Sequence, residues 1–371
     1  MARTRRARQT ASTLTALVLG ASLAAPSPTP AGAGGPPPSA TIVLVPYEGT
    51  TTAFVHDGAT TTAPYIPVTD GIVEGNFSAV PGSDVLVFGQ GGAPDGIVHV
   101  TPTDTGVTTS FRAETINSSY VPLVGDFDGN GIDDVFWYGA GNRPDSIWFF
   151  QPDGSHEIVN LNVWGHYRPF ALDADGNGQD DVFWYAPGTA ADSLWLFGVD
   201  ANVTKRSVTV NGSYDPHVGQ FQEVASDHPQ DQIVWHDPSG PDSLWSFTPS
   251  AGHTSHSLPN IDGLASPIVG HFLSGFQDSI FWYTPGSTNE YVMNFDPETG
   301  PFMVSGPSVD GLYTPVVGDF NGNGFEDIAW TSGGRLDIWQ LGNLGTVRTQ
   351  TWISTPYDAT VPAVARVPDE P

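Results

Sequence analysis

A repeated segment limits the fold of this chain more than any other feature. Its clearest copy begins PLVGDF at Pro122, and related segments begin near residues 72, 169, 216, 267, 315 and 362. Successive starts lie 47 to 51 residues apart, a period typical of arrays in which each unit packs against its neighbours. We therefore expect one repeat domain over residues 34–371.

Each full unit is expected to form four short strands. In the unit that starts at Pro122 we predict them at 122–127, 134–138, 146–150 and 157–163. The second and third strands, such as DVFWY and SIWFF, are apolar on both faces, which indicates a sheet that is covered on both sides. Four-stranded sheets packed face to face around an axis meet this requirement, and they are the blades of a β-propeller.

The two ends of the array together predict one more blade. Only one strand is expected after Pro362, whereas three further strands are expected at 41–46, 52–56 and 62–67. We predict an all-β, seven-bladed β-propeller of four-stranded blades, with a closing blade shared between N- and C-terminal strands. Such a blade would remove both open sheet edges. Six blades with frayed ends are the alternative.

Charge and composition exclude several classes of function. The chain has 40 acidic and 12 basic residues, a net charge of −28, so phosphate backbones and anionic lipid would repel it. We therefore expect no nucleic-acid partner. The chain has no cysteine, which excludes disulfides, thiol catalysis and cysteine-ligated metals. Its 43 glycines and 33 prolines fit a protein rich in turns.

The first 33 residues have the pattern of a secretory signal peptide. A basic segment, 1–9, precedes a small and apolar segment, 10–25, and the cleavage pattern Ala31-Gly32-Ala33 follows. The apolar segment is shorter than the ~20 residues that a membrane-spanning helix needs. We expect a secreted, extracellular protein that does not insert into membranes and is a monomer.

Three units carry an acidic loop of fixed spacing, D-x-[DN]-x-N-G-x-x-D, between the first and second strands. Oxygens of the side chains at positions 1, 3, 5 and 9 and of the backbone at position 7 can surround one hard cation, and glycine at position 6 permits the tight turn. All-oxygen ligation favours Ca²⁺ over zinc or copper, so we predict about three calcium sites. The predicted ligands are Asp126, Asp128, Asn130, Ile132 and Asp134; Asp173, Asp175, Asn177, Gln179 and Asp181; and Asp319, Asn321, Asn323, Phe325 and Asp327.

These loops resemble those of a known family of propellers. The segments GDFDGNGIDDVFWY (125–138), LDADGNGQDDVFWY (172–185) and GDFNGNGFEDIAW (318–330) are similar to FG-GAP/VCBS repeats, which occur in the head of integrin α-subunits and in many secreted bacterial proteins. The resemblance covers about residues 41–371. It implies seven blades, structural calcium at the blade periphery, and a role in adhesion or carbohydrate binding.

No catalytic or other cofactor-binding motif is present, since the chain lacks H-E-x-x-H, G-x-S-x-G and the P-loop pattern. The tryptophan that recurs once per unit, as at Trp137, is expected in the core. Tyr138, Tyr185 and Tyr283 lie beside glycine-containing hairpins and are possible ligand contacts, because a ring face and nearby polar groups suit a sugar. We expect a non-catalytic module for extracellular carbohydrate; the alternatives are a polysaccharide hydrolase or lyase, and a protein-adhesion module.

Overall fold

A computed structural model gives the fold of the chain. It describes residues 41–46, 51–56, 59–64, 71–80, 83–88, 95–103, 106–116, 120–222, 229–261, 263, 265–272, 277–287, 290–296, 299–321, 323–332, 335–341, 350–354 and 360–365. The predicted signal peptide, 1–33, lies outside these residues. Within them, no helix is long and apolar enough to cross a membrane.

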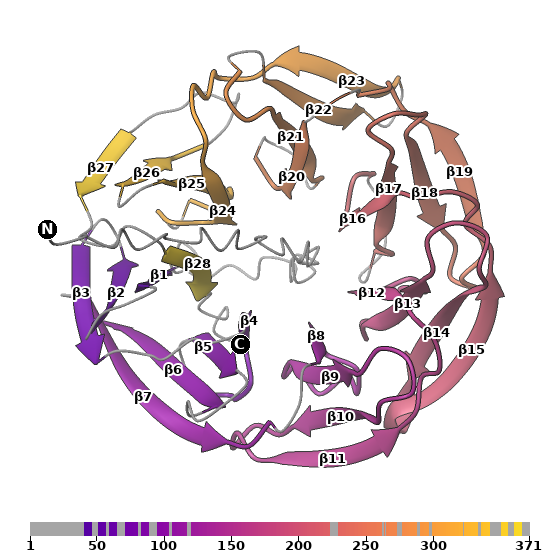
Figure 1. Ribbon diagram of the computed structural model, residues 1–371, viewed down its shortest axis with the longest axis horizontal. Helices are drawn as coiled ribbons and strands as arrows, with labels where there is room; N and C mark the ends of the chain where they lie inside the picture. Colours follow the sequence, from indigo (N-terminus) through magenta and orange to yellow (C-terminus); the bar gives the residue numbers. More distant parts are fainter. Residues whose placement is uncertain are drawn as a thin grey trace, which may run out of the picture.

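The described chain forms four-stranded antiparallel sheets arranged around a central axis (Figure 1). The first in sequence contains β4 (Gly71–Gly75), β5 (Ser83–Phe88), β6 (Asp95–Thr103) and β7 (Gly106–Glu114). The second contains β8 (Val121–Gly125), β9 (Asp134–Tyr138), β10 (Asp145–Phe150) and β11 (His156–Leu161). The third contains β12 (Arg168–Leu172), β13 (Asp181–Tyr185), β14 (Asp192–Gly198) and β15 (Asn202–Val208), with a 3-10 turn, η1 (Val199–Ala201), before β15.

Three further sheets continue around the axis in the same order (Figure 1). The fourth contains β16 (Asp215–Gly219), β17 (Gln232–His236), β18 (Ser243–Phe247) and β19 (His253–Ser257). The fifth contains β20 (Ser266–Gly270), β21 (Ser279–Tyr283), β22 (Tyr291–Asp296) and β23 (Gly300–Ser305). The sixth contains β24 (Thr314–Gly318), β25 (Asp327–Ser332), β26 (Arg335–Trp339) and β27 (Gln350–Ser354). These six sheets are blades, which confirms the prediction of an all-β propeller.

Strands from both ends of the sequence pair in another sheet. It contains β1 (Thr41–Pro46), β2 (Thr51–His56), β3 (Ala59–Pro64) and β28 (Thr360–Ala365), in the order β28-β1-β2-β3. Strands β1 and β28 are antiparallel, and their register runs from Thr41 opposite Ala365 to Pro46 opposite Thr360. Strand β3 begins and ends three residues before the predicted 62–67.

The predicted strands of the second blade match the observed ones to within two residues at each end. Strand β8 ends at Gly125, two residues before the predicted end, because Asp126 and Phe127 already belong to the acidic loop. Within each blade the first strand lies nearest the axis and the fourth lies at the rim, as β8 and β11 illustrate in Figure 1. The loops between strands one and two therefore open on one face of the ring, and the hairpins between strands two and three open on the other.

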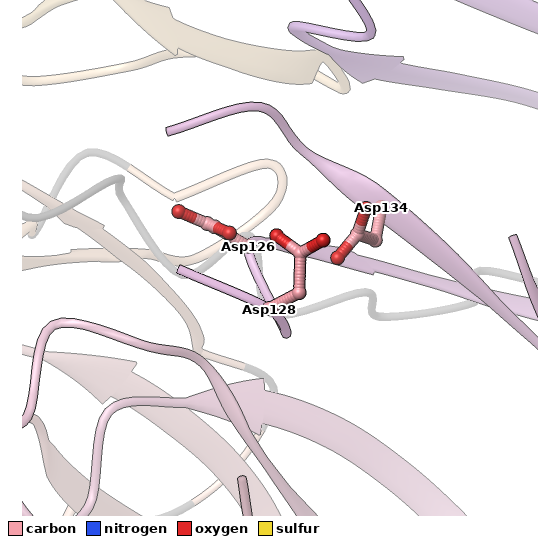
Figure 2. A group of neighbouring side chains, drawn as sticks. All are labelled: Asp126, Asp128 and Asp134. Atoms are coloured by element: carbon pink, nitrogen blue, oxygen red, sulfur yellow. The ribbon is translucent and has the colours of Figure 1, made fainter. Parts of the chain in front are cut away.

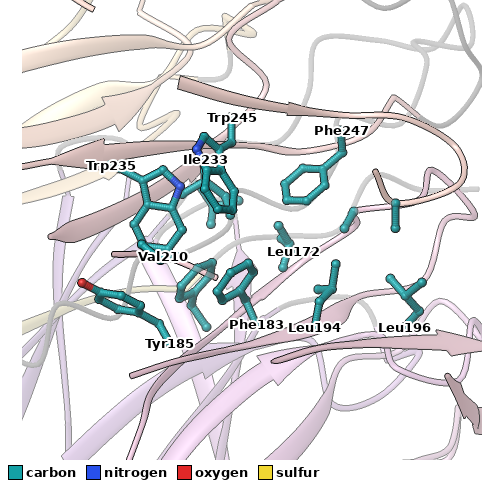
Figure 3. Close-up of a cluster of buried hydrophobic side chains, with 14 residues drawn as sticks. Leu172, Phe183, Tyr185, Leu194, Leu196, Val210, Ile233, Trp235, Trp245 and Phe247 are labelled. Atoms are coloured by element: carbon teal, nitrogen blue, oxygen red, sulfur yellow. The ribbon is translucent and has the colours of Figure 1, made fainter. Parts of the chain in front are cut away.

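The core lies between the blades. Trp137, Trp184, Trp235, Trp282 and Trp330 are each 1% exposed, which confirms that the recurring tryptophan is a packing residue. Trp235 lies against the preceding blade, with its ring 5.5 Å from that of Phe183 and 5.0 Å from that of Tyr185 (Figure 3). Because each sheet is covered on both faces, its second strand is buried along its whole length, as in β9, β13 and β21.

Candidate metal loops and the hairpin face

The first two acidic loops bring three carboxylates together. Carboxylate oxygens of Asp126, Asp128 and Asp134 all lie within 4.8 Å of one another (Figure 2). The second loop repeats this arrangement with Asp173, Asp175 and Asp181. Positions 1, 3 and 9 of the motif therefore meet in space, as the spacing predicts, and both clusters could hold a metal ion.

Backbone N–H groups fix the position-1 and position-9 carboxylates in the first loop. The Oδ1 atom of Asp126 accepts hydrogen bonds from the N–H groups of Gly129 and Asn130, and Oδ2 accepts one from Gly131 at 2.8 Å. Gly131 has a φ of +81°, a conformation that favours glycine, so the turn requires this residue. Asp134 accepts hydrogen bonds from the N–H groups of Phe127, in the loop, and Phe150, at the end of β10. These bonds connect the loop to the third strand of the blade.

Burial makes these carboxylates unfavourable as anions. Desolvation, together with the smaller effect of the neighbouring loop carboxylates, raises the pKa of Asp134 to about 8 and that of Asp181 to about 9. Burial also raises the pKa of Asp126 and of Asp173. A bound divalent cation would offset this cost, and clustered carboxylate oxygens suit a hard cation such as Ca²⁺.

Positions 5 and 7 close the turn in the first two loops. The side-chain oxygens of Asn130 and Asn177 accept hydrogen bonds from the N–H groups of Ile132 and Gln179, each at 2.7 Å. Their amide nitrogens donate to the carbonyls of Phe150 and Phe197. Ile132 and Gln179 are buried, so position 7 lies on the inner side of each loop.

The third loop has the same turn but fewer carboxylates. Asp319 accepts hydrogen bonds from the N–H groups of Asn323 and Gly324, and Asn323 accepts one from Phe325. Burial raises the pKa of Asp327 to about 8. Here the amide of Asn321 donates to Asp327 at 3.0 Å, so a neutral group faces the buried carboxylate where the other loops have a second acid.

A second set of acidic residues, which the sequence reasoning missed, joins one blade to the next. The N–H of Asp126 donates to the Asp180 carboxylate at 2.9 Å, and the N–H of Asp180 donates back to the Asp126 carbonyl at 2.9 Å. We call each such reciprocal pair a blade clasp. The clasps join Asn76 to Asp133, Asp126 to Asp180, Asp173 to Asp231, Gln220 to Asp278, and His271 to Glu326. The sequence signal was an acid directly before the second strand of the second to sixth blades, as in DDV, DQI and EDI.

The three tyrosines expected at a ligand are in the interior. Tyr138 and Tyr185 are 0% exposed and Tyr283 is 2% exposed. Their hydroxyls donate to the carbonyls of Gly165, Gly212 and Gly311, and accept from the N–H groups of Tyr167, Tyr214 and Tyr313. This corrects the expectation of ligand contact, because the rings have no free face and the hydroxyls are already used.

A different ring of tyrosines lies on the hairpin face. Tyr120, Tyr167, Tyr214 and Tyr313 are half-buried, and each packs edge-on against the tryptophan of its own blade. At Gly165, Gly212 and Gly311 an added Cβ would lie 2.5 to 2.7 Å from the following tyrosine ring, so only glycine permits this packing. The sequence signal was G-x-Y-x-P before three of the first strands.

Glycine pairs hold this face together between strands. Gly141 pairs with Gly165, and Gly188 with Gly212, while the N–H of Gly286 donates to the Gly311 carbonyl at 2.8 Å. Trp164 and Leu312, next to these glycines, are 66% and 71% exposed. Polar side chains are exposed beside them, among them Asn142, His166, Asn211, Ser213 and Asp310. The hairpin face therefore repeats half-buried rings next to accessible polar groups.

Comparison with known proteins identifies the fold. The chain matches no protein-family model and no curated protein. A lectin from Agrocybe aegerita, which specifically recognises non-reducing terminal N-acetylglucosamine, superposes with a TM-score of 0.70 at 11% identity, over 89% of this chain and 96% of the lectin. A Lactobacillus plantarum protein (TM-score 0.59, 10% identity, 88% and 99% coverage) and the Pseudomonas aeruginosa periplasmic gluconolactonase (0.53, 13%, 89% and 99%) are also similar. The chain is a β-propeller of the fold found in these lectin and lactonase structures.

Proposed function

We propose that this protein is a secreted, calcium-stabilised β-propeller that binds extracellular carbohydrate without catalysis. The observation that carries the proposal is the ring of half-buried tyrosines on the hairpin face, which repeats beside exposed polar side chains. The likeness in fold to a lectin that recognises N-acetylglucosamine adds support and suggests the first sugar to test. The predicted signal peptide supports export.

The hairpin face has the chemistry that a sugar site needs. An aromatic ring offers a flat apolar face to the C–H groups of a pyranose, and amide, hydroxyl and imidazole groups can bond its hydroxyls. Tyr167 supplies such a ring, with Trp164 and His166 exposed beside it. Because similar positions recur in several blades, weak sites could act together on one polysaccharide and raise its apparent affinity.

Removal of the exposed Trp164 or of the half-buried Tyr167 should weaken sugar binding. We expect Trp164→Ala and Tyr167→Ala each to weaken retention on the preferred polysaccharide about tenfold, the equivalent of roughly 1.4 kcal/mol. Phe302→Ala is the matched control, because Phe302 is 45% exposed on the rim strand β23, away from the hairpins. Affinity electrophoresis on a panel that includes N-acetylglucosamine polymers measures the effect.

The same panel separates the alternatives. Soluble sugar released from a polysaccharide would instead favour the hydrolase or lyase. Retention that is unaffected by competing sugars, or equal losses in all three variants, would contradict a glycan site on this face. Binding to an extracellular protein without any sugar dependence would favour adhesion.

We also propose that the β28-β1-β2-β3 sheet closes the ring as a seventh blade, within one domain over residues 34–371. The six-residue register between β1 and β28 supports this closure. Truncation that removes residues 358–371 deletes β28, and we expect it to lower the melting temperature markedly because it reopens two sheet edges. A truncation of 366–371 is the control and should melt as the full chain does. Equal melting of both truncations would favour a six-bladed ring with frayed ends.

A further inference from the structure

The fourth blade differs from its neighbours at two positions on one face. His236 stands where the second, third and fifth blades have Tyr138, Tyr185 and Tyr283. His217 occupies the place of an apolar residue, which is Leu123, Phe170 or Ile268 in those blades. Two titratable rings therefore replace a tyrosine and an aliphatic or aromatic side chain.

Both histidines face the seam with the fifth blade. His217 pairs with Val234 across β16 and β17, and His236 is two residues further along, so the three side chains share one face of the sheet. Val234 belongs to the apolar cluster that includes Trp282 of the next blade. The ring of His236 lies 4.9 Å from that of Trp282, as Tyr138 lies 5.1 Å from Trp184 in the corresponding seam.

The polar atoms of the seam are incompletely paired. His236 is 1% exposed, and its Nδ1 lies 3.0 Å from the carboxylate of Asp242. The Nε2 atoms of His217 and His236 are inaccessible to solvent and have no hydrogen-bond partner. At the same position in the second, third and fifth blades the tyrosine hydroxyl both donates and accepts. The indole Nε1 of the recurring tryptophan is buried without a partner in these blades too, so what sets the fourth blade apart is its two unpaired imidazole nitrogens.

Few charged groups act on this pair. Asp242, from the hairpin of the same blade, is buried beside His236, and it also accepts the N–H groups of Asp237 and Ile261. Asp215, opposite His236 on β16, is exposed and lies 3.4 Å from Arg168. Ile280 and Trp282 of the fifth blade, which belong to the same cluster as Val234, are apolar. Among the described residues, none of these carboxylates is hydrogen-bonded to His217, so a proton on His217 would have no carboxylate partner there.

We propose that this histidine seam is an acid-sensitive joint of the ring, closed while His217 is neutral and loosened when the surroundings become acidic. Protonation of His217 would place a proton on an unpaired nitrogen, so that the buried ring has an N–H donor without an acceptor. Such a donor is costly in an apolar seam. The carboxylate of Asp242 lies against His236 and not against His217, so it does not supply that acceptor.

The direction of the effect follows from proton linkage. Burial, and then the nearby His236, lower the pKa of His217 to about 3 from its ordinary 6.5. The folded state therefore binds this proton more weakly than the unfolded state does. The contribution to stability is complete above about pH 6.5 and is lost as the pH falls towards 3, with the unfolding equilibrium constant rising about tenfold per pH unit.

Denaturant unfolding between pH 7 and pH 4.5 tests the joint. We expect His217→Leu, which copies the second blade, to remove this one contribution. With each pH unit of acidification its unfolding constant should then rise about tenfold less, or fall about tenfold more, than that of the wild type, in which the buried loop carboxylates act in the opposite direction. His256→Leu is the matched control, because His256 is exposed on β19 of the same blade, and it should keep the wild-type slope. If His217→Leu fails to fold, His217→Gln, which is neutral at every pH used, allows the same comparison.

Hydrogen exchange, corrected for its intrinsic pH dependence, locates the opening. At pH 5 we expect lost protection in peptides that cover β16, β17, β20 and β21, while β12 and β13 stay protected; His236→Tyr should restore protection at the seam. A His217→Leu variant with the wild-type pH slope would overturn the proposal. Loss of protection spread evenly over all blades would overturn it as well.

Discussion

At pH 8 and without divalent cations, the protein should melt at a lower temperature than at pH 5, and millimolar calcium should reverse this loss. Burial raises the pKa of Asp134 and Asp327 to about 8 and that of Asp181 to about 9, well above their ordinary 3.8. The folded, metal-free protein thus retains protons that the unfolded chain releases above about pH 4. Stability is complete below that pH and is lost as the pH rises through the raised values.

Differential scanning calorimetry at both pH values, with chelator and with calcium, measures this effect. We expect calcium to raise the melting temperature by several degrees at pH 8 and by less at pH 5, where protons already neutralise the carboxylates. Equal melting with and without calcium at pH 8 would contradict the assignment of the loops.

A single substitution should remove one of the proposed calcium sites. Asp173→Asn deletes the position-1 carboxylate of the second loop, so calcium stoichiometry by isothermal titration should fall by one. Asp153→Asn is the control, because Asp153 is exposed outside the acidic loops and bonds only within its own turn. Unchanged stoichiometry in Asp173→Asn would show that this loop binds no calcium.

Trp235→Ala should destabilise the protein by about 3–5 kcal/mol. Trp235 is 1% exposed and fills the seam between the third and fourth blades, with rings of Phe183, Tyr185 and Trp245 within 5.5 Å of it. Its removal would leave a cavity that two rigid sheets cannot close. Urea unfolding at pH 7 gives the change in the free energy of unfolding.

The exposed Trp164 provides the matched control for this experiment. Trp164→Ala removes the same side chain from a position that is 66% exposed, and we expect a change within about 0.5 kcal/mol. If Trp235→Ala cost no more than Trp164→Ala, the seams between blades would not be the main source of stability.

The blades could be predicted from the sequence because the same strand pattern recurs in successive units, each in the same structural environment. DVFWY in two successive units could only be buried on both faces, so the strand, its neighbours on both sides and the core position of Trp137 and Trp184 followed together. The acidic loop was predictable for the same reason, since its spacing fixes which carboxylates meet.

Contacts between neighbouring units could not be predicted from the sequence of a single unit. The partner of the Tyr138 hydroxyl is Gly165, 27 residues away and at the entrance to the next blade, so a tyrosine beside a hairpin suggested a ligand contact. The significance of His236 depends likewise on Trp282 in another blade. A periodic sequence shows which residues recur, but it does not show whether a polar group is satisfied by solvent or by the neighbouring repeat.

The blade clasps bear on how such a chain can change in length over evolution. Each of the five units that begin near residues 122, 169, 216, 267 and 315 supplies an acid near its second strand to the unit before it. The unit before it supplies the backbone N–H and carbonyl. A duplicated unit would therefore arrive with both halves of its connection already encoded. Gene duplication could add a repeat without a new interface having to arise by point mutation, and the acid could be kept even in units whose metal ligands have been lost.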